Sequence, residues 1–565
     1  MNVLQVNINA QTPNWVWGKQ ATANGIFISQ HEGMGVATDN FGNVYATGSF
    51  DSVMNFGLFT LPHVRGWDIF LVKYSSSGNF LWATSAGGTG NDQSFSVATD
   101  ALGNVFLTGS FTSPTITFGT FTLTNSGSSD VFIVKYSSTG TILWAKSMGG
   151  SGMETGYSVA TDASNNVYVT GTFASSTITV GSTVLTNAGS SNIFLVKYDI
   201  NGNILWAKRE GGIGSDIGYS LTIDASYNIY LTGYFTSSTL SFGSIVLSNS
   251  GGQDMFIVKY NNSQNVLWAK NSIGTGTDYA SSIAIDVSGF IYVTGYFNSP
   301  NIAFGNFNIT NTSLTPSGSN GYDLYLVKYN SLGTELFVKI VGGKHNEKGY
   351  SVATDNSGVY ITGGLIGTPQ DTQIYIDSNT YNIPSPSGDP MCLIKYDFNG
   401  NPICVSILTG GGDDISCIAT DNFGNAYLSG DLLGNMPYIF GADTLTRLNT
   451  EYFFIAKYNC NTSPEGINEI TKEESLTLYP NPATTSFTIE STNKIQSIKV
   501  INVIGEEIIT NYESALRQAQ GDRSTNNATI DVSGIAKGIY FVQITTTSAG
   551  SVNGNTVVNK KIVVQ

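Results

Sequence analysis

The sequence is poor in charged residues, and this shortage excludes several classes of protein. Asp, Glu, Lys and Arg make up 12% of its 565 residues, about half of the usual share. Lys and Arg number 25 against 40 Asp and Glu, which leaves a net charge of −15. Binding to nucleic acid or to an anionic membrane surface needs clustered cations, so the sequence predicts neither partner. Aromatic residues also make up 12% of the chain, too many for a mostly disordered protein.

Histidine, cysteine and long apolar runs are scarce as well. No apolar run approaches the roughly 20 residues that span a bilayer, so we expect no transmembrane segment. Neither a Gly-rich phosphate loop with its lysine nor a Gly-x-Ser-x-Gly elbow occurs. A histidine-rich metal site is hard to build from the three histidines, His31, His63 and His345. Three disulfide pairings remain open among the four cysteines, Cys392, Cys404, Cys417 and Cys460.

The amino terminus has few features of a secretory signal. It lacks both a basic region and an apolar stretch of about 7–15 residues. Residues 9–11, Asn-Ala-Gln, nevertheless resemble the tail of a signal cleavage site. Two interpretations stay open for residues 1–10: the remnant of a signal peptide, or an ordinary frayed terminus.

Internal repetition dominates the sequence up to residue 458. The pattern Gly-Tyr-Ser-Val-Ala-Thr-Asp at residues 156–162 recurs in variant form at intervals of 61 to 69 residues. A Lys-Tyr pair closes an apolar run in every unit. A Leu-Trp-Ala run marks a further strand through Trp82, Trp144, Trp206 and Trp268, and it decays to Phe337 and Cys404. The aspartate that ends the repeated pattern is Asp39, Asp100, Asp162, Asp224, Asp286, Asp355 and Asp421.

Each unit is predicted to form four strands. In the third unit they cover residues 158–162, 167–172, 193–198 and 204–208, and the aspartate begins a tight turn between the first two. A further segment of about 20 residues lies between the second and third strands, and its pattern over 115–125 predicts an inserted hairpin. Seven such units are typical of a β-propeller. No helical periodicity separates the strands, which excludes a TIM barrel or a doubly wound sheet.

The two ends of the repeat region are permuted. Residues 15–19 are the first copy of the fourth strand, and they precede any first strand, whereas the last unit stops at its third strand, residues 453–458. This order makes sense if the ends pair in a ring, because an open array would leave both edges unpaired. We therefore predict an all-β, seven-bladed propeller over residues 11–458. One tryptophan per unit in one register favours packing between blades over ligand stacking, and the tyrosines of the second strands are interpreted in the same way.

The repeats resemble the SBBP-type β-propeller repeat family. The motif Asp-x-x-Gly-Asn-x-x-x-Thr-Gly stands at residues 100–109, an Asp-x-Phe-x-x-Lys motif at 130–135, and a strand that ends in Gly-Gly at 143–150. The resemblance covers about residues 15–458 and implies the fold. It implies no single activity.

The composition changes after residue 458. Residues 459–474 are polar and are predicted to be a linker. Residues 475–565 carry short alternating strands separated by turns, which predict a small β-sandwich. This stretch resembles the type A C-terminal sorting domain of the type IX (Por) secretion system of Bacteroidota. The resemblance implies handling by the type IX secretion machinery and a secreted or outer-surface location, and it rests on Tyr479, Pro480, Asn481, Pro482, Gly538, Tyr540, Lys560 and Lys561.

Acidic residues collect on one predicted face of the propeller, where the connections from fourth to first strands and the long insertions meet. Ringed carboxylates of this kind focus negative potential and could hold Ca²⁺. Alternatively, each acid caps its own turn by accepting backbone N–H groups, which repetition in every unit favours. The first set lies eight residues before the repeated aspartate and comprises Asp92, Glu154, Asp216, Asp278, Glu347 and Asp413. A second set precedes the third strands and comprises Asp68, Asp130, Asn192, Asp254, Asp323, Asp389 and Glu451.

Three functions compete on these features. The first is a secreted or surface-attached propeller without catalysis that binds a glycan or a protein. The second is a polysaccharide hydrolase or lyase with the acidic face as its site, which a distinct, unrepeated polar cluster at one side of the channel would favour. The third is a structural spacer without a ligand. We expect a monomer with no cofactor other than Ca²⁺, and the fold itself names no ligand.

Overall fold

The computed structural model divides into two compact units, Met1–Thr462 and Ser463–Gln565. Each is described by itself. The structure describes residues 15–23, 35–313, 321–344, 346–366, 373–377, 379–383, 390–408, 414–432, 437–445, 452–460, 477–479, 483–491, 494–502, 507–509, 526–547 and 555–564. The predicted segment 1–10 lies outside these ranges.

Every regular element in the described ranges is a strand, so the all-β prediction is confirmed. None of the described segments is a helix long and apolar enough to cross a membrane. The repeats of the first unit form sheets of four antiparallel strands each, in the order first, second, third, fourth. In one sheet the hairpin of the following repeat extends this order to six strands.

Four positions recur in these sheets. The first strands are β3 (Gly35–Thr38), β9 (Asp92–Thr99), β15 (Glu154–Thr161), β21 (Asp216–Ile223), β28 (Asp278–Ile285), β34 (Asn346–Thr354) and β40 (Asp414–Thr420). The second strands are β4 (Val44–Phe50), β10 (Val105–Phe111), β16 (Val167–Phe173), β22 (Ile229–Phe235), β29 (Ile291–Phe297), β35 (Val359–Ile366) and β41 (Asn425–Leu432). The third strands are β7 (Asp68–Tyr74), β13 (Asp130–Tyr136), β19 (Asn192–Tyr198), β25 (Asp254–Tyr260), β32 (Asp323–Tyr329), β38 (Met391–Tyr396) and β44 (Tyr452–Asn459). The fourth strands are β8 (Phe80–Ala86), β14 (Ile142–Met148), β20 (Ile204–Glu210), β26 (Val266–Asn271), β33 (Glu335–Gly342), β39 (Pro402–Leu408) and β1 (Trp15–Gln20).

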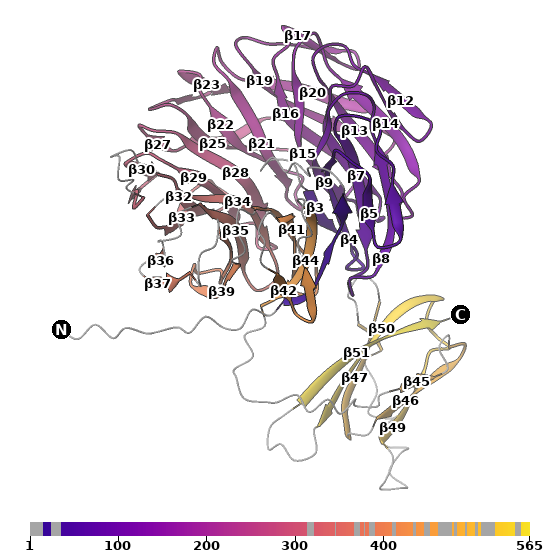
Figure 1. Ribbon diagram of the computed structural model, residues 1–565. Coiled ribbons are helices and arrows are strands. Elements are labelled where there is room, and N and C mark those ends of the chain that lie inside the picture. Colours follow the sequence, from indigo (N-terminus) through magenta and orange to yellow (C-terminus); the bar gives the residue numbers. More distant parts are fainter. Residues whose placement is uncertain are drawn as a thin grey trace, which may run out of the picture. The chain divides into compact units, whose positions relative to one another are not determined.

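The first strands form a closed ring. Each contacts the first strand of the next sheet, from β3 through β9, β15, β21, β28 and β34 to β40, and β40 contacts β3. Figure 1 shows these strands nearest the middle, with the sheets fanned around them. The first unit is therefore a β-propeller, as predicted.

Burial between neighbouring sheets explains the composition of the middle strands. All seven residues of β16 and of β19 are buried, on both faces of the sheet. Each apolar cluster joins two sheets; one of them packs Phe106 and Ile133 of one sheet against Val167 and Val196 of the next. A strand covered on both faces becomes a continuous apolar run, which is the pattern that the repeats show.

The segments between second and third strands form the predicted hairpins. The hairpin of the second sheet pairs Thr115 with Thr124. β2 (Thr22–Ala23) and β27 (Ile273–Gly274) each add a short strand to a hairpin. The hairpins are β5 (Met54–Phe56) with β6 (Phe59–Leu61), β11 (Thr115–Phe118) with β12 (Phe121–Thr124), β17 (Thr177–Val180) with β18 (Thr183–Thr186), β23 (Thr239–Phe242) with β24 (Ile245–Ser248), β30 (Asn301–Phe304) with β31 (Phe307–Thr310), β36 (Gln373–Ile376) with β37 (Asn379–Asn382), and β42 (Tyr438–Phe440) with β43 (Asp443–Leu445).

The amino-terminal strand closes the ring, as the permuted repeats predict. β1 pairs antiparallel with β44, with Trp15 opposite Tyr458 and Gln20 opposite Phe454. Trp15 packs edge-on against Tyr458 and Phe440, with ring centroids 4.9 and 4.8 Å apart. The last sheet therefore contains both ends of the repeat region.

A recurrent contact joins the first, second, fourth and last sheets each to the next. The lysine that ends a third strand and the tryptophan of the fourth strand both donate to one carbonyl, in the turn after the third strand of the next sheet. Lys73 Nζ and Trp82 Nε1 donate to Ser138 O at 3.0 and 3.2 Å. Lys135 and Trp144 donate in the same way to Ile200 O. The predicted role of the tryptophans in packing between blades is confirmed.

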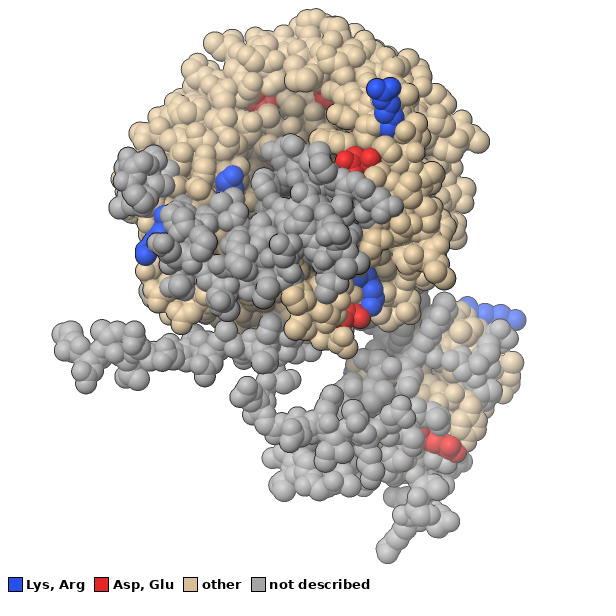
Figure 2. All heavy atoms as spheres, in the orientation of Figure 1, with Lys and Arg blue, Asp and Glu red and all other residues tan. Residues whose placement is uncertain are grey.

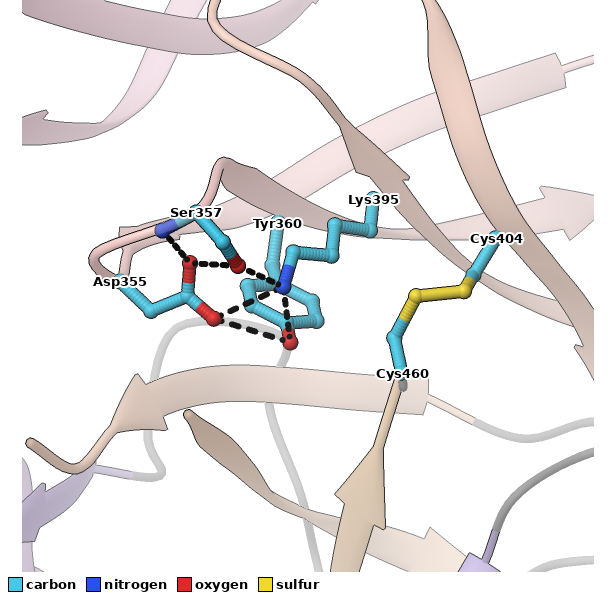
Figure 3. The surroundings of a disulfide bond; sticks show 6 residues. All are labelled: Asp355, Ser357, Tyr360, Lys395, Cys404 and Cys460. Carbon is cyan, nitrogen blue, oxygen red and sulfur yellow. Dashed lines mark hydrogen bonds and ion pairs between the residues drawn. A yellow bond between two sulfur atoms is a disulfide. The ribbon is translucent and has the colours of Figure 1, made fainter. Parts of the chain in front are cut away.

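The sixth sheet breaks this pattern. The fourth strand of the last sheet is β1, so no turn connects it to the third strand, β44. Lys395 Nζ instead bonds Asp355 Oδ2, Ser357 Oγ and the Tyr360 hydroxyl of its own sheet, at 2.8, 2.7 and 2.9 Å. Cys404 stands at the tryptophan position and forms a disulfide with Cys460, directly after β44 (Figure 3). Cys392 and Cys417 form no disulfide. A covalent bond thus joins these two sheets where the chain supplies no turn, and the first residues of the predicted linker belong to the propeller.

The second unit contains two sheets that pack face to face. One orders β45 (Thr477–Tyr479), β46 (Ser486–Ser491) and β49 (Asn526–Asp531). The other orders β48 (Glu507–Ile509), β47 (Lys494–Asn502), β50 (Gly538–Thr547) and β51 (Asn555–Val564). Their shared core includes Phe487 and Ile530 from the first sheet and Val542 and Ile562 from the second. This is the predicted small β-sandwich.

Candidate functional site

A bulge interrupts the innermost strand of most sheets at one register position. Ser96 and Ser94 pair with the adjacent Thr108 and Gly109, so that Phe95 is the extra residue. Corresponding bulges lie at Tyr157, Tyr219, Ser281, Tyr350 and Ser416. A bulge turns a side chain away from its usual alternation and is frequent beside binding sites. Here it lets consecutive residues of one strand both line the axis of the ring.

A glycine of the second strand permits this bulge. A Cβ on Gly109 would lie 1.9 Å from the Gln93 carbonyl oxygen and 2.8 Å from the Phe132 ring. Neither neighbour can withdraw, because one is backbone and the other is a buried side chain. The glycine at this position of the second strand is therefore a requirement of the bulge.

Serine hydroxyls connect neighbouring inner strands next to the bulges. Ser96 Oγ accepts the Val159 N–H at 3.2 Å, and Ser158 Oγ accepts the Leu221 N–H at 3.2 Å. The same bond recurs from Ile283 to Ser220, from Val352 to Ser282 and from Ile418 to Ser351. Cys417 takes the serine position in the last sheet, where its thiol meets the Val36 N–H and burial raises its pKa to about 12. No acceptor for the five serine hydroxyl hydrogens appears among the described residues, and all five serines line the axis of the ring.

Aromatic rings form a continuous arc on one side of the channel. Phe95 contacts Tyr157 with centroids 5.5 Å apart, and Tyr157 contacts Tyr219 at 4.7 Å. The series continues through Tyr234, Tyr279, Tyr296 and Tyr322 at separations of 4.7 to 5.7 Å. All seven rings are half-buried. We call these seven residues the aromatic wall.

The aromatic wall climbs from the inner strands to the face that carries the insertions. Phe95, Tyr157 and Tyr219 lie at the bulges within their strands, whereas Tyr279 is the second residue of β28 and Tyr322 directly precedes β32. The ends of the strands at this face also hold both predicted acidic sets. The face chosen from the sequence is therefore the one on which the wall emerges.

Five rings of the wall, all except Tyr234 and Tyr322, line a cavity of about 420 Å³ on the axis of the ring. Its opposite side is made of small or aliphatic residues, Gly35, Val36, Cys417 and Ile418. One cation lines it: Lys348 Nζ lies 5.3 Å from the ring centroids of both Tyr296 and Tyr322. The described residues that line the cavity include no Asp, Glu or His. Figure 2 shows that charged side chains on one face of the molecule are isolated patches on a mostly neutral surface.

The first acidic set bonds to neighbouring backbone and serine groups. Asp92 accepts the Gly88 N–H at 2.9 Å, the Thr112 and Ser113 N–H groups, and the Ser113 hydroxyl at 2.7 Å. Asp216 and Asp278 are held in the same way by Ser237 and Ser299. Glu154 accepts the Gly150 and Ser175 N–H groups, and Glu347 Oε2 lies 2.8 Å from the Ser313 hydroxyl, which Asp323 also contacts. These are the bonds of the capping alternative. Asp413 lies outside the described residues.

The second acidic set lies beside the first, across each junction between sheets. Asp68, Asp130 and Asp254 each accept one backbone N–H through Oδ2, whereas the buried Oδ1 has no partner in the described part of the chain. Burial raises the pKa of Asp254 to about 6. Burial, with the nearby charge of Asp254, raises the pKa of Asp278 to about 7. Asn192 takes the same place in the third sheet, and Arg209 donates to its Oδ1 at 2.8 Å.

Three members of the second set remain. Asp323 accepts the Thr312 N–H at 2.7 Å and a hydroxyl hydrogen from Ser313. Asp389 and Glu451 lie outside the described residues. No group of three Asp, Glu, His or Cys side chains placed to hold a metal ion occurs in the part of the chain that the structure describes. The Ca²⁺ site stays a prediction.

The sequence pattern does not reveal the aromatic wall. Four bulge positions carry Phe95, Tyr157, Tyr219 and Tyr350, five residues before the repeated aspartate, and repetition alone suggests packing. The tyrosines of the second strands, such as Tyr168, are indeed buried, and the Tyr168 hydroxyl donates to Asp162 Oδ2 at 3.0 Å. The available signal was the set of tyrosines that breaks the repeat: Tyr234, Tyr279, Tyr296 and Tyr322.

The predicted sorting residues lie in or beside the sandwich. Tyr479 ends β45 and bonds Glu490 through its hydroxyl, and the Tyr540 hydroxyl donates to Ala536 O at 2.7 Å. Gly538 opens β50 opposite Val564. Lys560 and Lys561 belong to β51, opposite Val542 and Phe541. Pro480, Asn481 and Pro482 lie outside the described residues.

Residues 477–565 match the family of secretion system C-terminal sorting domains, the Por secretion tail. The prediction of a sorting domain is therefore confirmed. The protein is one that is secreted or carried on the outer cell surface.

The repeats have distant relatives. A WD repeat-containing protein of Acanthamoeba polyphaga mimivirus is 26% identical over 410 residues, which cover 60% of this chain and 29% of that protein. Regulatory protein FlaEY of Caulobacter vibrioides is 25% identical over 362 residues, which cover 60% of this chain and 35% of that protein. The chain spans about a third of the length of these curated relatives.

Similar folds occur among solved structures. A member of the DUF4221 family from Bacteroides vulgatus has a TM-score of 0.30 at 10% identity, over 64% of this chain and 92% of that one. The WD40 repeats of RRP9 have a TM-score of 0.28 at 8% identity, over 61% of this chain and 90% of that one. Likenesses of this strength bear on neither ligand nor activity.

Proposed function

We propose that this protein is a non-catalytic binding protein of the outer cell surface, exported by the type IX route, and that the aromatic wall of its channel holds the ligand. The observation that carries the proposal is the wall itself, a series of seven half-buried rings in contact, five of which line one side of a cavity. Structural packing alone would bury such rings, as it buries Tyr168 and its counterparts. A concave site with apolar rings and a few polar groups is the usual form of a binding pocket.

The sorting domain and the disulfide support the export route. Disulfides persist outside the reducing cytosol, and Cys404–Cys460 is placed where the propeller lacks a turn. The resemblance of the repeats to the SBBP-type family and of the tail to the Bacteroidota sorting domain agrees with this route.

The hydrolase or lyase alternative needs a pair of carboxylates at the cavity. The described carboxylates of the acidic face are instead engaged by backbone N–H groups and serines, and none lines the cavity. A structural spacer would not require an accessible aromatic wall. Binding at the wall accounts for these observations together.

A binding screen with the full chain tests the proposal. Wild-type protein is applied to a panel of polysaccharides and extracellular proteins beside the double variant Tyr219→Ala/Tyr279→Ala and the control Phe423→Ala. Phe423 is an exposed aromatic in a turn after β40 and lies away from the wall. We expect a ligand that the wall variant loses and the control keeps. Binding that survives the wall variant, or conversion of a polymer to shorter products, would overturn the proposal.

A further inference from the structure

We propose that the aromatic wall binds a neutral saccharide chain, an inference that rests on the proposed function of the channel. The site has three properties that such a ligand requires. These are an apolar platform for the C–H faces of sugar rings, hydrogen-bond donors for their oxygens, and an electrostatic environment that disfavours ions of either sign.

The platform is the row of tyrosine rings. Tyr157 and Tyr219 lie 4.7 Å apart at 42°, and Tyr279 and Tyr296 lie 4.7 Å apart at 34°. Rings inclined in this way present a stepped surface and not one flat plate. An aromatic face is apolar in its body, and the tyrosine hydroxyl adds a polar edge. A chain of linked sugar rings offers alternating apolar faces and hydroxyl edges that match such a surface.

The donors are the serines below the wall. The oxygen of each of five serines already accepts a backbone N–H from the next inner strand, as from Leu221 to Ser158 and from Ile283 to Ser220. A hydroxyl has one hydrogen to donate, and in the described structure these hydrogens have no protein acceptor. The cavity therefore presents donors in a regular series, which suits hydroxyl and ring oxygens as acceptors.

The charges around the site disfavour ionic ligands. The net charge of −15 repels polyanions at long range. Lys348, at the end of the wall, repels a cation inside the cavity. No described carboxylate lines the cavity to counter either effect. A neutral ligand experiences neither of these repulsions.

The size of the cavity limits the ligand further. Its volume of about 420 Å³ falls in the range of roughly 300–1,000 Å³ that is usual for small-ligand sites. This volume accepts a short oligosaccharide segment and excludes a folded protein.

The test is a titration of the full chain with charged and uncharged oligosaccharides. The neutral probes are hexasaccharides of maltose, cellulose and xylan type, and the charged probes are an oligogalacturonate and a chitosan oligomer. Tyr219→Ala and Tyr279→Ala remove single rings, Tyr279→Phe keeps the ring, and Phe423→Ala is the matched control. We expect one neutral probe to bind, with Kd raised about tenfold by either alanine variant and little changed by the other two. A melting curve shows that each variant is folded.

A second measurement needs no variant. In saturation-transfer NMR with the wild-type protein, the ring C–H protons of the bound neutral probe should receive saturation, and sorbitol should not. If only a charged probe binds, or if neutral binding is untouched by Tyr219→Ala and Tyr279→Ala, the inference is wrong. If no saccharide binds while the wall variant still abolishes capture of a protein ligand, the inference fails and the proposed function stands.

Discussion

Lys457 Nζ donates to the carbonyl oxygen of Ser76 at 3.1 Å, although the two residues lie 381 positions apart in the chain. Trp17 Nε1 donates to the same oxygen at 3.2 Å. Lys73 and Trp82 make the same pair of bonds to Ser138 in the next sheet. The junction between the last and first sheets is thus built like a junction between sequence neighbours, and the tryptophan comes from the amino-terminal strand.

Removal of residues 1–20 should destabilise the propeller strongly. It exposes the β44 edge and deletes the buried Trp15 and Trp17. Loss of one buried large aromatic side chain alone costs about 3–5 kcal/mol. We expect a clearly lower melting temperature or aggregation, measured by calorimetry and light scattering. An unchanged melting temperature would contradict ring closure by β1.

Removal of the disulfide should also destabilise the last sheet, at its junction with the sixth sheet. The double variant Cys404→Ala/Cys460→Ala should lose about 2–4 kcal/mol of unfolding free energy, because the sixth sheet has no turn carbonyl to bond in the next one. Denaturant titration with and without reductant measures this loss. The control is Cys392→Ser, a free thiol, which should not respond to reductant. Equal stability of the oxidised wild type and the double variant would refute the role of the bond.

Stability should fall as pH rises from about 4 to about 7. The pKa of Asp254 is raised to about 6 and that of Asp278 to about 7, from an ordinary 3.8. The folded state therefore holds protons that the unfolded state has lost, which makes the slope of unfolding free energy against pH negative in this window. The variant Asp254→Asn should show a smaller fall between pH 5 and pH 8 in urea titrations.

The control for this pH dependence is Asn192→Asp, at the matching position in the third sheet. Arg209 lies against that side chain and would stabilise a new carboxylate. This variant should therefore add little pH dependence. A fall in Asp254→Asn as large as in the wild type would show that the buried carboxylates are not its source.

The acidic face should respond to mutation more than to calcium. Asp92→Ala removes the acceptor of three backbone N–H groups and a serine hydroxyl, so we expect a loss of about 1–3 kcal/mol. Calcium at about 1 mM, the range of extracellular calcium modules, should leave the wild-type melting temperature unchanged. A calcium-dependent rise that Asp216→Asn/Asp278→Asn abolishes would instead establish the cation site.

Deletion of residues 475–565 should block delivery without unfolding the propeller. The two units are separately compact, and the deleted part matches the sorting family. Fractionation of the host cells should find the shortened protein in the periplasm, with the melting transition of the propeller retained. Normal surface display of the shortened protein, or loss of the melting transition of its propeller, would contradict this division of roles.

Most of the fold follows from patterns that repeat. The turn aspartate, the Thr-Gly pair and the Lys-Tyr pair predicted four strands per unit, and the displaced strand at residues 15–19 predicted closure. These features are local or periodic, so a sequence reveals them directly. The cysteine pairing could not be chosen, because it depends on a turn that is missing from the neighbouring sheet.

The aromatic wall was beyond prediction for a geometric reason. Tyr219, Tyr234 and Tyr279 occupy different registers of different strands, and only the ring geometry brings their side chains into one row. The bulge that turns Tyr157 and Ser158 to one side cannot be recognised in the hydrophobic pattern of so short a strand. The long insertions and the acidic residues of the sequence pointed to the face on which the wall emerges, and the described acids of the first set accept backbone N–H groups or serine hydroxyls there.

The pairing of β1 with β44 also sets the order of events during synthesis. The first strand leaves the ribosome early and has no partner until residue 459 has followed it. The propeller cannot complete its last sheet before nearly the whole repeat region exists, and contacts so distant along the chain form slowly. A newly made chain therefore keeps its ring open until nearly the whole repeat region has been translated.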